Sequence, residues 1–293
     1  RVPPGDVQSV PLSTSDLETD PERLRVTWLG HSAVVVQMAG RTILIDPMLG
    51  PRASPLSFAG PKRLIDAPMQ PADLPRVDAV VFSHDHYDHL DKPSVKTLVA
   101  AHDPLFLVPL GLGDIVRGWG ANRVAEMDWD QFVDLPATGG YEPVRVSCTP
   151  ARHFSGRSVT NRNGTLWASW YLSTESEGEP MRLYYGGDTG YGSLFSEIRD
   201  RYGVPDVALL PIGAYLPRWF MEEVHMAPEN SVQAAIDLGS PYVIPVHWGV
   251  FDLADEPMSE PPARFHRYAL EAGIDDRIRE LKIGERWELP TTK

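Results

Sequence analysis

The sequence has almost no cysteine and no long apolar run. Cys148 is the only cysteine among the 293 residues, so the chain can form neither an intrachain disulfide nor a thiolate metal cluster. No apolar stretch approaches the roughly 20 residues that cross a bilayer, which predicts a soluble protein without a transmembrane segment. The lone cysteine fits a reducing compartment, so we expect the cytoplasm, although a chain that begins at Arg1 leaves a removed N-terminal signal open.

Positive charge is also scarce, because 27 basic residues face 40 acidic ones and give a net charge of −13. A surface of that sign repels phosphate backbones, which argues against a nucleic-acid partner. It also weakens electrostatic docking to anionic lipid. Peripheral membrane contact therefore stays open only through apolar or local basic surface, and a homodimer stays open as well.

Several common catalytic motifs are absent. The sequence contains no G-x-S-x-G nucleophile elbow, no P-loop and no G-x-G-x-x-G after a predicted strand, which excludes the usual signatures of serine hydrolases, P-loop enzymes and dinucleotide-dependent enzymes. Ser83-His84-Asp85 holds the letters of a catalytic triad, but sequence neighbours rarely reach triad geometry.

The chain divides into an arm and one domain. Residues 1–23 contain four prolines among polar residues and show no apolar periodicity, so we expect an irregular N-terminal arm and a single folded domain over residues 24–293. Ala39-Gly40 between two apolar runs predicts a tight hairpin turn. Runs of strand length predict the following strands: Val26–Trp28, Ala33–Met38, Thr42–Ile45, Ala79–Phe82, Leu105–Val108, Val144–Cys148, Leu166–Leu172, Met181–Tyr185, Val207–Leu210 and Tyr242–Val246.

Helical spacing occurs in fewer places. Asp91 is a suitable N-cap for a helix that begins near Lys92, because apolar residues follow at three- and four-residue spacing. Further helices are predicted from Pro228 to Gly239 and from Pro262 to Gly273. Together these elements predict a mixed α/β chain.

The densest chemistry lies between Ser83 and Leu90, where the chain reads Ser-His-Asp-His-Tyr-Asp-His-Leu directly after an apolar run. Imidazole and carboxylate are ordinary ligands of zinc and related divalent ions. A polar surface turn is the alternative, but it gives no reason for histidine at His84, His86 and His89 rather than Asn, Ser or Gly. We therefore interpret this segment as part of a metal site.

Three further ligand-type residues follow predicted strands in the same way. His153 comes after one such strand, Asp188 after another and His247 after a third. Ligands at the same ends of neighbouring strands can meet in one cleft. Seven side chains then suffice for two metal ions: His84, His86, Asp88, His89, His153, Asp188 and His247.

The run from His84 to His89 satisfies H-x-H-x-D-H, the motif of the metallo-β-lactamase superfamily, which the chain therefore resembles. The resemblance implies an αββα sandwich, with two sheets face to face, helices outside and a dinuclear metal site at one edge. Asp188 would bridge the two ions, and Asp46 would lie buried beneath the metal loop without binding metal itself. The implied ligand groups are His84, His86 and His153 for one ion, and Asp88, His89 and His247 for the other.

A closer similarity extends from about Leu24 to Leu289 and resembles the N-acyl-phosphatidylethanolamine-hydrolysing phospholipase D family. It implies two zinc ions, although manganese or iron would fit many of the same ligands. The segments that carry it include Trp28-Leu29-Gly30-His31, Gly187-Asp188-Thr189-Gly190-Tyr191, Pro211-Ile212-Gly213-Ala214-Tyr215, Pro217-Arg218-Trp219-Phe220-Met221 and His247-Trp248-Gly249.

The same resemblance suggests substrate contacts. His225 precedes a predicted helix and matches a histidine near the substrate in that family, where it could bind phosphate or protonate the leaving group. The alternative for His225 is a surface histidine near a helix start. Tyr191 and Trp219 lie in segments that carry the similarity, so we expect them at the substrate. His31 directly precedes an apolar strand, which favours a packed structural role.

These features predict a zinc-dependent phosphodiester hydrolase of phospholipase D type that acts on N-acyl-phosphatidylethanolamine or a related phospholipid. Two divalent ions can share and activate a water for attack at phosphorus, with Asp188 and His225 as the expected catalytic residues. The alternative is a carboxyl-directed hydrolase on the same scaffold, such as a lactonase or β-lactamase, in which the water attacks a carbonyl carbon.

Overall fold

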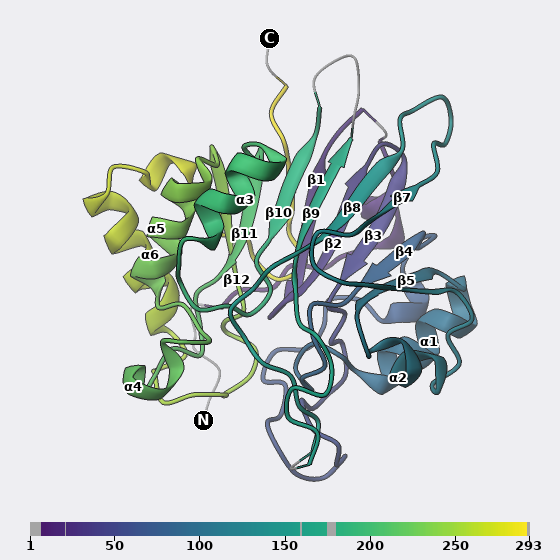
Figure 1. Ribbon diagram of the computed structural model, residues 1–293, viewed down its shortest axis with the longest axis horizontal. Helices are drawn as coiled ribbons and strands as arrows, with labels where there is room; N and C mark the ends of the chain where they lie inside the picture. The colour runs from purple at the N-terminus through teal and green to yellow at the C-terminus, as the bar shows by residue number, and fades with distance from the viewer. Residues whose placement is uncertain (1–6, 21, 159, 175–179, 292–293) are drawn as a thin grey trace.

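Two β-sheets lie at the centre of the molecule, with helices on both outer sides (Figure 1). The computed structural model describes residues 7–20, 22–158, 160–174 and 180–291. The seven-stranded sheet has the order β13 (Arg286–Glu288), β1 (Arg25–Gly30), β2 (Ala33–Met38), β3 (Arg41–Ile45), β4 (Ala79–Val81), β5 (Leu105–Pro109) and β6 (Val124–Met127). The six-stranded sheet has the order β12 (Tyr242–Val246), β11 (Val207–Pro211), β10 (Arg182–Tyr185), β9 (Ser169–Thr174), β8 (Val144–Thr149) and β7 (Phe132–Leu135).

The helices form the two outer layers. Figure 1 shows α1 (Lys92–His102) and α2 (Gly113–Arg117) on the side of β4 and β5, and α3 (Leu194–Tyr202), α5 (Pro228–Leu238) and α6 (Glu260–Glu271) on the side of β11 and β12. The short helix α4 (Arg218–Met221) lies at the lower edge of that view. This arrangement confirms the expected αββα sandwich. None of the helices in the described part of the chain is long and apolar enough to cross a bilayer.

The strands of the first sheet are apolar on both faces because each face meets another layer. Along β2, Val34 and Val36 belong to the core between the sheets, whereas Val35 belongs to a second core under α1 and α2. A strand buried on both faces appears in sequence as a continuous apolar run instead of an alternating one. This explains why the central strands are easy to predict.

The structure contains each strand that the sequence predicts, but the start of β9 was placed three residues too early. The backbone N–H of Leu166 donates to the carbonyl of Leu110 at 2.8 Å, and that of Ala168 donates to the carbonyl of Ser83 at 2.8 Å. These residues therefore join neighbouring loops, and pairing with β8 begins only at Ser169. The strands β6, β7 and β13 and the helices α2, α3 and α4 were not predicted.

The helix predictions are confirmed with small shifts. Asp91 caps α1, because its carboxylate accepts the backbone N–H of Ser94 at 3.0 Å. Helix α5 begins at Pro228 and ends before Gly239, which adopts the left-handed φ of 72°. Helix α6 begins at Glu260, two residues before the predicted start.

The predicted hairpin turn and part of the N-terminal arm can both be located in the structure. Ala39 and Gly40 both have positive φ, 47° and 70°, as a tight hairpin turn of the predicted kind requires. Residues 1–6 and 21 of the expected arm lie outside the described residues. In the remaining part, Leu17 is fully buried and its carbonyl accepts the side-chain amide of Gln37 at 2.6 Å. This part of the arm therefore packs against β2.

Gly213 marks a close approach between the loops that follow β11 and β12. A Cβ atom at Gly213 would lie 2.2 Å from the carbonyl oxygen of His247. We expect Gly213→Ala to cost about 1–3 kcal/mol of unfolding free energy, because the two backbones must separate. Thermal unfolding measures the change. Gly156→Ala is the control, since its nearest neighbour would be Arg162 at 3.6 Å, and equal melting temperatures for both variants would contradict the prediction.

Candidate metal centre

The seven side chains expected as ligands meet at one edge of the sandwich, beyond the carboxyl ends of strands from both sheets. His84, His86, Asp88 and His89 follow β4 of the first sheet. The second sheet supplies the remaining three, with His153 after β8, Asp188 after β10 and His247 after β12. Potential metal-binding groups found among the described residues include all seven of them.

One group consists of His84, His86 and His153. The Nε2 atom of His84 lies 2.9 Å from Nδ1 of His86, which lies 3.2 Å from Nε2 of His153. Nitrogen ligands about 2.0–2.1 Å from a tetrahedral zinc ion are spaced at roughly this distance from one another. The three ring nitrogens therefore converge as a metal site requires.

The outward nitrogens of two of these rings are held by the protein. Nδ1 of His153 donates to the carbonyl of Val224 at 2.9 Å, and Nδ1 of His84 lies 2.9 Å from the hydroxyl of Ser83. Such contacts fix the ring orientation and the tautomer, leaving Nε2 to face the centre.

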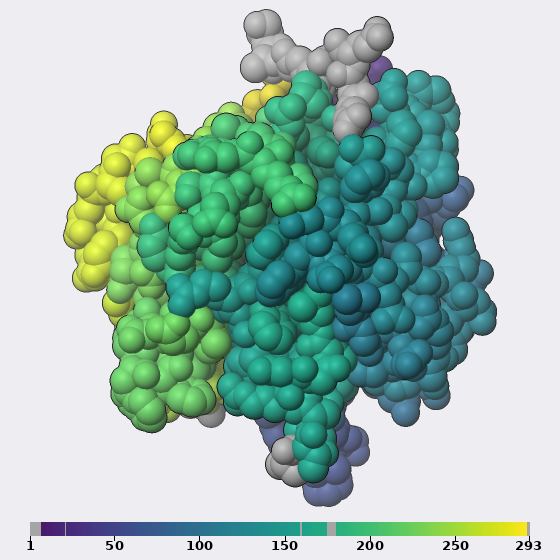
Figure 2. Space-filling model, in the orientation of Figure 1, coloured from purple at the N-terminus to yellow at the C-terminus, as the bar shows by residue number. Residues whose placement is uncertain are grey.

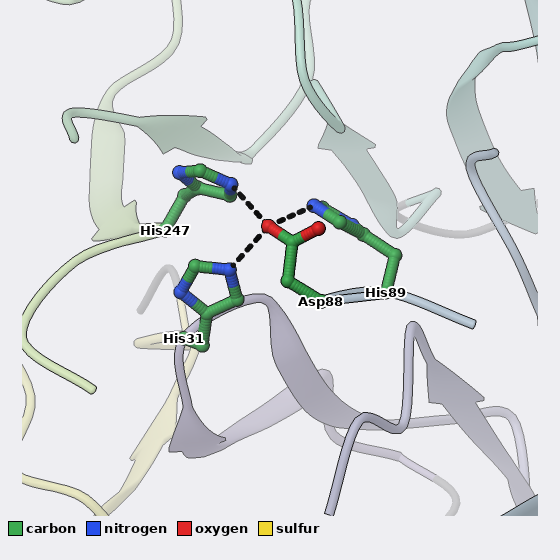
Figure 3. A group of neighbouring side chains, drawn as sticks. All are labelled: His31, Asp88, His89 and His247. Atoms are coloured by element: carbon green, nitrogen blue, oxygen red, sulfur yellow. Dashed lines mark hydrogen bonds and ion pairs between the residues drawn. The ribbon is translucent and has the colours of Figure 1, made fainter. Parts of the chain in front are cut away.

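A second group surrounds Asp88 (Figure 3). Its Oδ2 lies 3.0 Å from Nε2 of His31, 3.3 Å from Nε2 of His247 and 3.6 Å from Nε2 of His89. The packed structural role favoured for His31 was therefore incomplete: the ring is buried, but it contacts a candidate ligand. Its sequence signal was its position just after β1, the same placement at a strand end that indicated the other site residues.

Asp188 lies between the two groups. Its Oδ1 is 3.1 Å from Nε2 of His247, and its Oδ2 is 3.2 Å from Nε2 of His89. The same Oδ2 lies 3.9 Å from Nε2 of His84 and 3.8 Å from Nε2 of His153. A carboxylate in this position can contact cations held by both groups.

Buried polar atoms without a hydrogen bond provide a direct test of whether a cation fits. Nε2 of His89, Nε2 of His247 and Oδ1 of Asp188 are buried and make no hydrogen bond among the described residues. Buried polar atoms normally have partners, because each unsatisfied one costs roughly 1–3 kcal/mol. All three atoms face the centre, so a bound divalent cation would satisfy them together. The residues present therefore fit the metal that the pattern implies.

The electrostatics of the two groups differ. Burial and neighbouring imidazoles lower the pKa of His84 and His153 well below the usual range, which favours the neutral form that binds metal. Burial also lowers the pKa of His89 and His247, but the neighbouring carboxylates, Asp188 first among them, together outweigh it and raise both pKa values, that of His247 to about 9. The side of the centre near Asp88 and Asp188 thus favours positive charge.

Asp46 lies directly beneath the centre, as the resemblance implied. Its Oδ1 accepts the backbone N–H of Ser83 at 2.7 Å, and its Oδ2 accepts the hydroxyl of Tyr185 at 2.6 Å and contacts Nδ1 of His89 at 2.7 Å. Asp46, His31 and His247 all have positive φ, between 41° and 60°. Residues other than glycine rarely adopt this backbone conformation, and such backbone strain is concentrated at functional sites.

The residues expected at the substrate lie in three different environments. His225 is buried, with Nδ1 3.9 Å from Oδ2 of Asp188, which excludes the surface alternative. The hydroxyl of Tyr191 donates to the carboxylate of Asp237 on α5 at 2.6 Å. Trp219 on α4 is 81% exposed. Substrate roles for these three residues remain predictions.

The sequence of this chain is similar to those of several known proteins. The family described as the beta-lactamase superfamily domain matches residues 41–248. The chain belongs to this superfamily. An uncharacterized protein of Mycobacterium tuberculosis is 45% identical over 261 residues, which cover 87% of this chain and 67% of the relative. The N-acyl-phosphatidylethanolamine-hydrolyzing phospholipase D 1 of Caenorhabditis elegans is 36% identical over 275 residues, which cover 90% of this chain and 76% of the relative.

A solved structure shares the fold of this superfamily member. Igni18, described as a novel metallo hydrolase from the archaeon Ignicoccus hospitalis, aligns with a TM-score of 0.67 at 22% identity and covers 92% of this chain and 100% of its own. This alignment shows the metallo-β-lactamase fold. The superfamily match, the hydrolase name of the C. elegans relative and the His/Asp cluster identify a metal-dependent hydrolase.

Asp46→Asn tests whether the Asp46 carboxylate is needed to hold His89 in position for metal binding. The amide keeps the shape of the carboxylate but removes the negative charge that holds Nδ1 of His89, so we expect metal affinity to fall about 10–100-fold. Competition with a chelator, followed by metal analysis, measures the change. Asp134→Asn, an exposed carboxylate paired with Arg145, is the control. Equal metal retention in the two variants would show that His89 does not depend on Asp46.

Proposed function

We propose that the protein is a dinuclear metal-dependent phosphodiesterase of phospholipase D type that cleaves N-acyl-phosphatidylethanolamine or a related phospholipid. The observation that carries this proposal is the position of Asp188 between two histidine groups, because paired metal sites suit displacement at phosphorus. The named activity of the similar C. elegans enzyme supports the choice of substrate class.

In this proposal, His84, His86 and His153 hold one cation, Asp88, His89 and His247 hold the other, and Asp188 contacts both. Bound divalent cations, with zinc as the first candidate, supply an activated water and neutralise charge on the phosphoryl oxygens. His31 donates from Nε2 to Asp88 at 3.0 Å and holds that carboxylate in place. Burial lowers the pKa of His31 to about 3, so its ring stays neutral.

His225 is placed to contact the substrate. Its Nδ1 is buried, faces Asp188 and has no hydrogen-bond partner among the described residues. An imidazole N–H in that position can donate to a phosphoryl oxygen and orient the phosphodiester. The backbone N–H of His225 donates to the carbonyl of Met221 at 2.7 Å, so the residue is fixed to the end of α4.

Exposed aromatic side chains beside the centre support a lipid substrate. Trp219 is 81% exposed and Phe220 is 57% exposed, and both belong to α4, which is joined to His225. Figure 2 shows α4 (light green) at the same lower edge of the molecule as the segments near residues 50–60 (blue) and 150–165 (teal). Phe58 in the first of these segments is 78% exposed. Apolar surface next to a charged centre matches acyl chains next to a phosphate head group.

Asp188→Asn tests the shared carboxylate. We expect lower metal content and hydrolysis reduced about 100-fold or more, because the charge that both histidine groups face is removed. Metal analysis and initial rates are measured on the same preparation, with Asp134→Asn as the control. Full metal content with normal turnover would count against the role given to Asp188.

A substrate panel then separates the proposed activity from the carboxyl-directed alternative. The metal-analysed protein is assayed on N-acyl-phosphatidylethanolamine, a short soluble phosphodiester, a lactone and a β-lactam. Turnover of the phosphodiesters is the expected outcome, and turnover confined to the lactone or the β-lactam would reject the proposal.

Trp219→Ala tests whether this ring contacts the lipid substrate. Loss of this exposed ring should raise KM for N-acyl-phosphatidylethanolamine in vesicles about 10- to 100-fold, because a truncated apolar contact of this size costs roughly 1.5–3 kcal/mol. The effect on the short soluble phosphodiester should be much smaller. Phe132→Ala, which truncates a 52% exposed ring on β7, should leave both values unchanged. Parallel losses on the two substrates would mean that Trp219 acts on the centre and not on the lipid.

A further inference from the structure

A cavity lies at the opposite end of the first sheet from the metal centre. It has a volume of about 290 Å³, and its lining includes Arg41, Arg76, Asp78, His102 and Arg123. These residues stand where strands begin: Arg41 opens β3, Asp78 precedes β4 and Arg123 precedes β6. Asp46 follows the other end of β3 and the candidate ligands His84 to His89 follow the other end of β4, so the cavity is separate from the centre.

The charge in this cavity is opposite to that of the whole protein. Its lining contains three arginines and one carboxylate, Asp78, although the chain as a whole has a net charge of −13. Asp78 is already engaged on both oxygens. Its Oδ1 accepts from Arg41 at 2.7 Å and from Arg76 at 3.0 Å, and its Oδ2 accepts the backbone N–H of Thr42 at 3.0 Å. One negative charge against three positive charges leaves an excess of two, which favours a dianion.

The cavity is also organised before any ligand arrives. The Arg41 side chain is only 12% exposed and donates from Nε to the carbonyl of Pro136 at 3.1 Å. Arg123 donates from Nη1 to the carbonyl of Asp103 at 3.2 Å, and His102 contacts the carbonyl of Pro71 at 3.1 Å. Fixed donors lose little conformational freedom on binding.

We propose that this cavity binds a phosphate dianion, either free or carried by a small monoester. A guanidinium group has five N–H donors in a planar fork that matches phosphate geometry, and the contacts to Asp78 and Asp103 engage one donor each of Arg76 and Arg123. A phosphate monoester carries a charge of about −1.5 to −2 at neutral pH, which balances the excess of positive charge. The apolar side chains of Val77, Leu105 and Leu135 line the remaining wall and suit a small organic group.

Direct titration of the metal-loaded full chain tests the proposal, with inorganic phosphate and glycerol 3-phosphate as separate probes. Backbone amide NMR signals locate binding, because Thr42 and Leu105 report on the cavity and His84 and His89 report on the metal centre. We expect saturable shifts at Thr42 and Leu105 with at least one probe. The tighter of the two probes then identifies the source of the phosphate.

A matched pair of variants separates this site from general electrostatics. Arg76→Ala combined with Arg123→Ala removes two exposed arginines of the cavity, and the dissociation constant read at Thr42 should rise at least tenfold. Arg201→Ala combined with Arg267→Ala removes two exposed arginines elsewhere and should leave it within twofold.

Three results would overturn the proposal. These are shifts confined to the metal centre, equal weakening in both double variants, and equal or tighter binding of succinate, which would indicate a dicarboxylate. Thermal unfolding of each double variant confirms that the comparison is made between folded proteins.

Discussion

The contact of one carboxylate, Asp188, with histidines from both sheets is the constraint on which the remaining structure depends. His89 lies in the loop after β4 of the first sheet and His247 directly follows β12 of the second, and both lie within 3.2 Å of this carboxylate. Buried charge is tolerated only when it is paired. The sheets must therefore hold these groups in register, and the apolar core between them, to which Val34 and Val36 contribute, provides the rigid support.

A layer of polar contacts fixes the candidate metal ligands to this rigid core. Asp46 joins Ser83, Tyr185 and His89, so a hydroxyl from the second sheet and a backbone N–H from the first meet on one carboxylate. The indole of Trp170 on β9 donates to the carbonyl of Phe82 at 3.1 Å, which ties the second sheet to the start of the metal loop. The strained backbone at Asp46 persists because these surrounding contacts define its position.

The sequence allowed the central strands and the seven convergent side chains to be predicted, because both leave local signals. Burial on two faces produces continuous apolar runs, and His84–His89 concentrates ligands in six residues. The strands β6, β7 and β13 were missed because they are short and mostly half-buried or exposed, so pairing with a neighbour, not composition, makes them strands. His31 was assigned only to packing. Its position after a strand is a local signal, but its contact with Asp88 spans 57 positions along the chain, so the sequence did not reveal that partner.

The pair β3 and β4 connects the two ends of the molecule. These parallel strands are clamped at both ends by carboxylates: Asp78, before β4, accepts the backbone N–H of Thr42 in β3, and Asp46, after β3, accepts the backbone N–H of Ser83 after β4. Parallel strands gather like ends at one edge of a sheet, which is why arginines collect at one end and imidazoles at the other. Asp78 thus fixes Arg41 and Arg76 to the start of the same strand whose other end leads directly to Asp46.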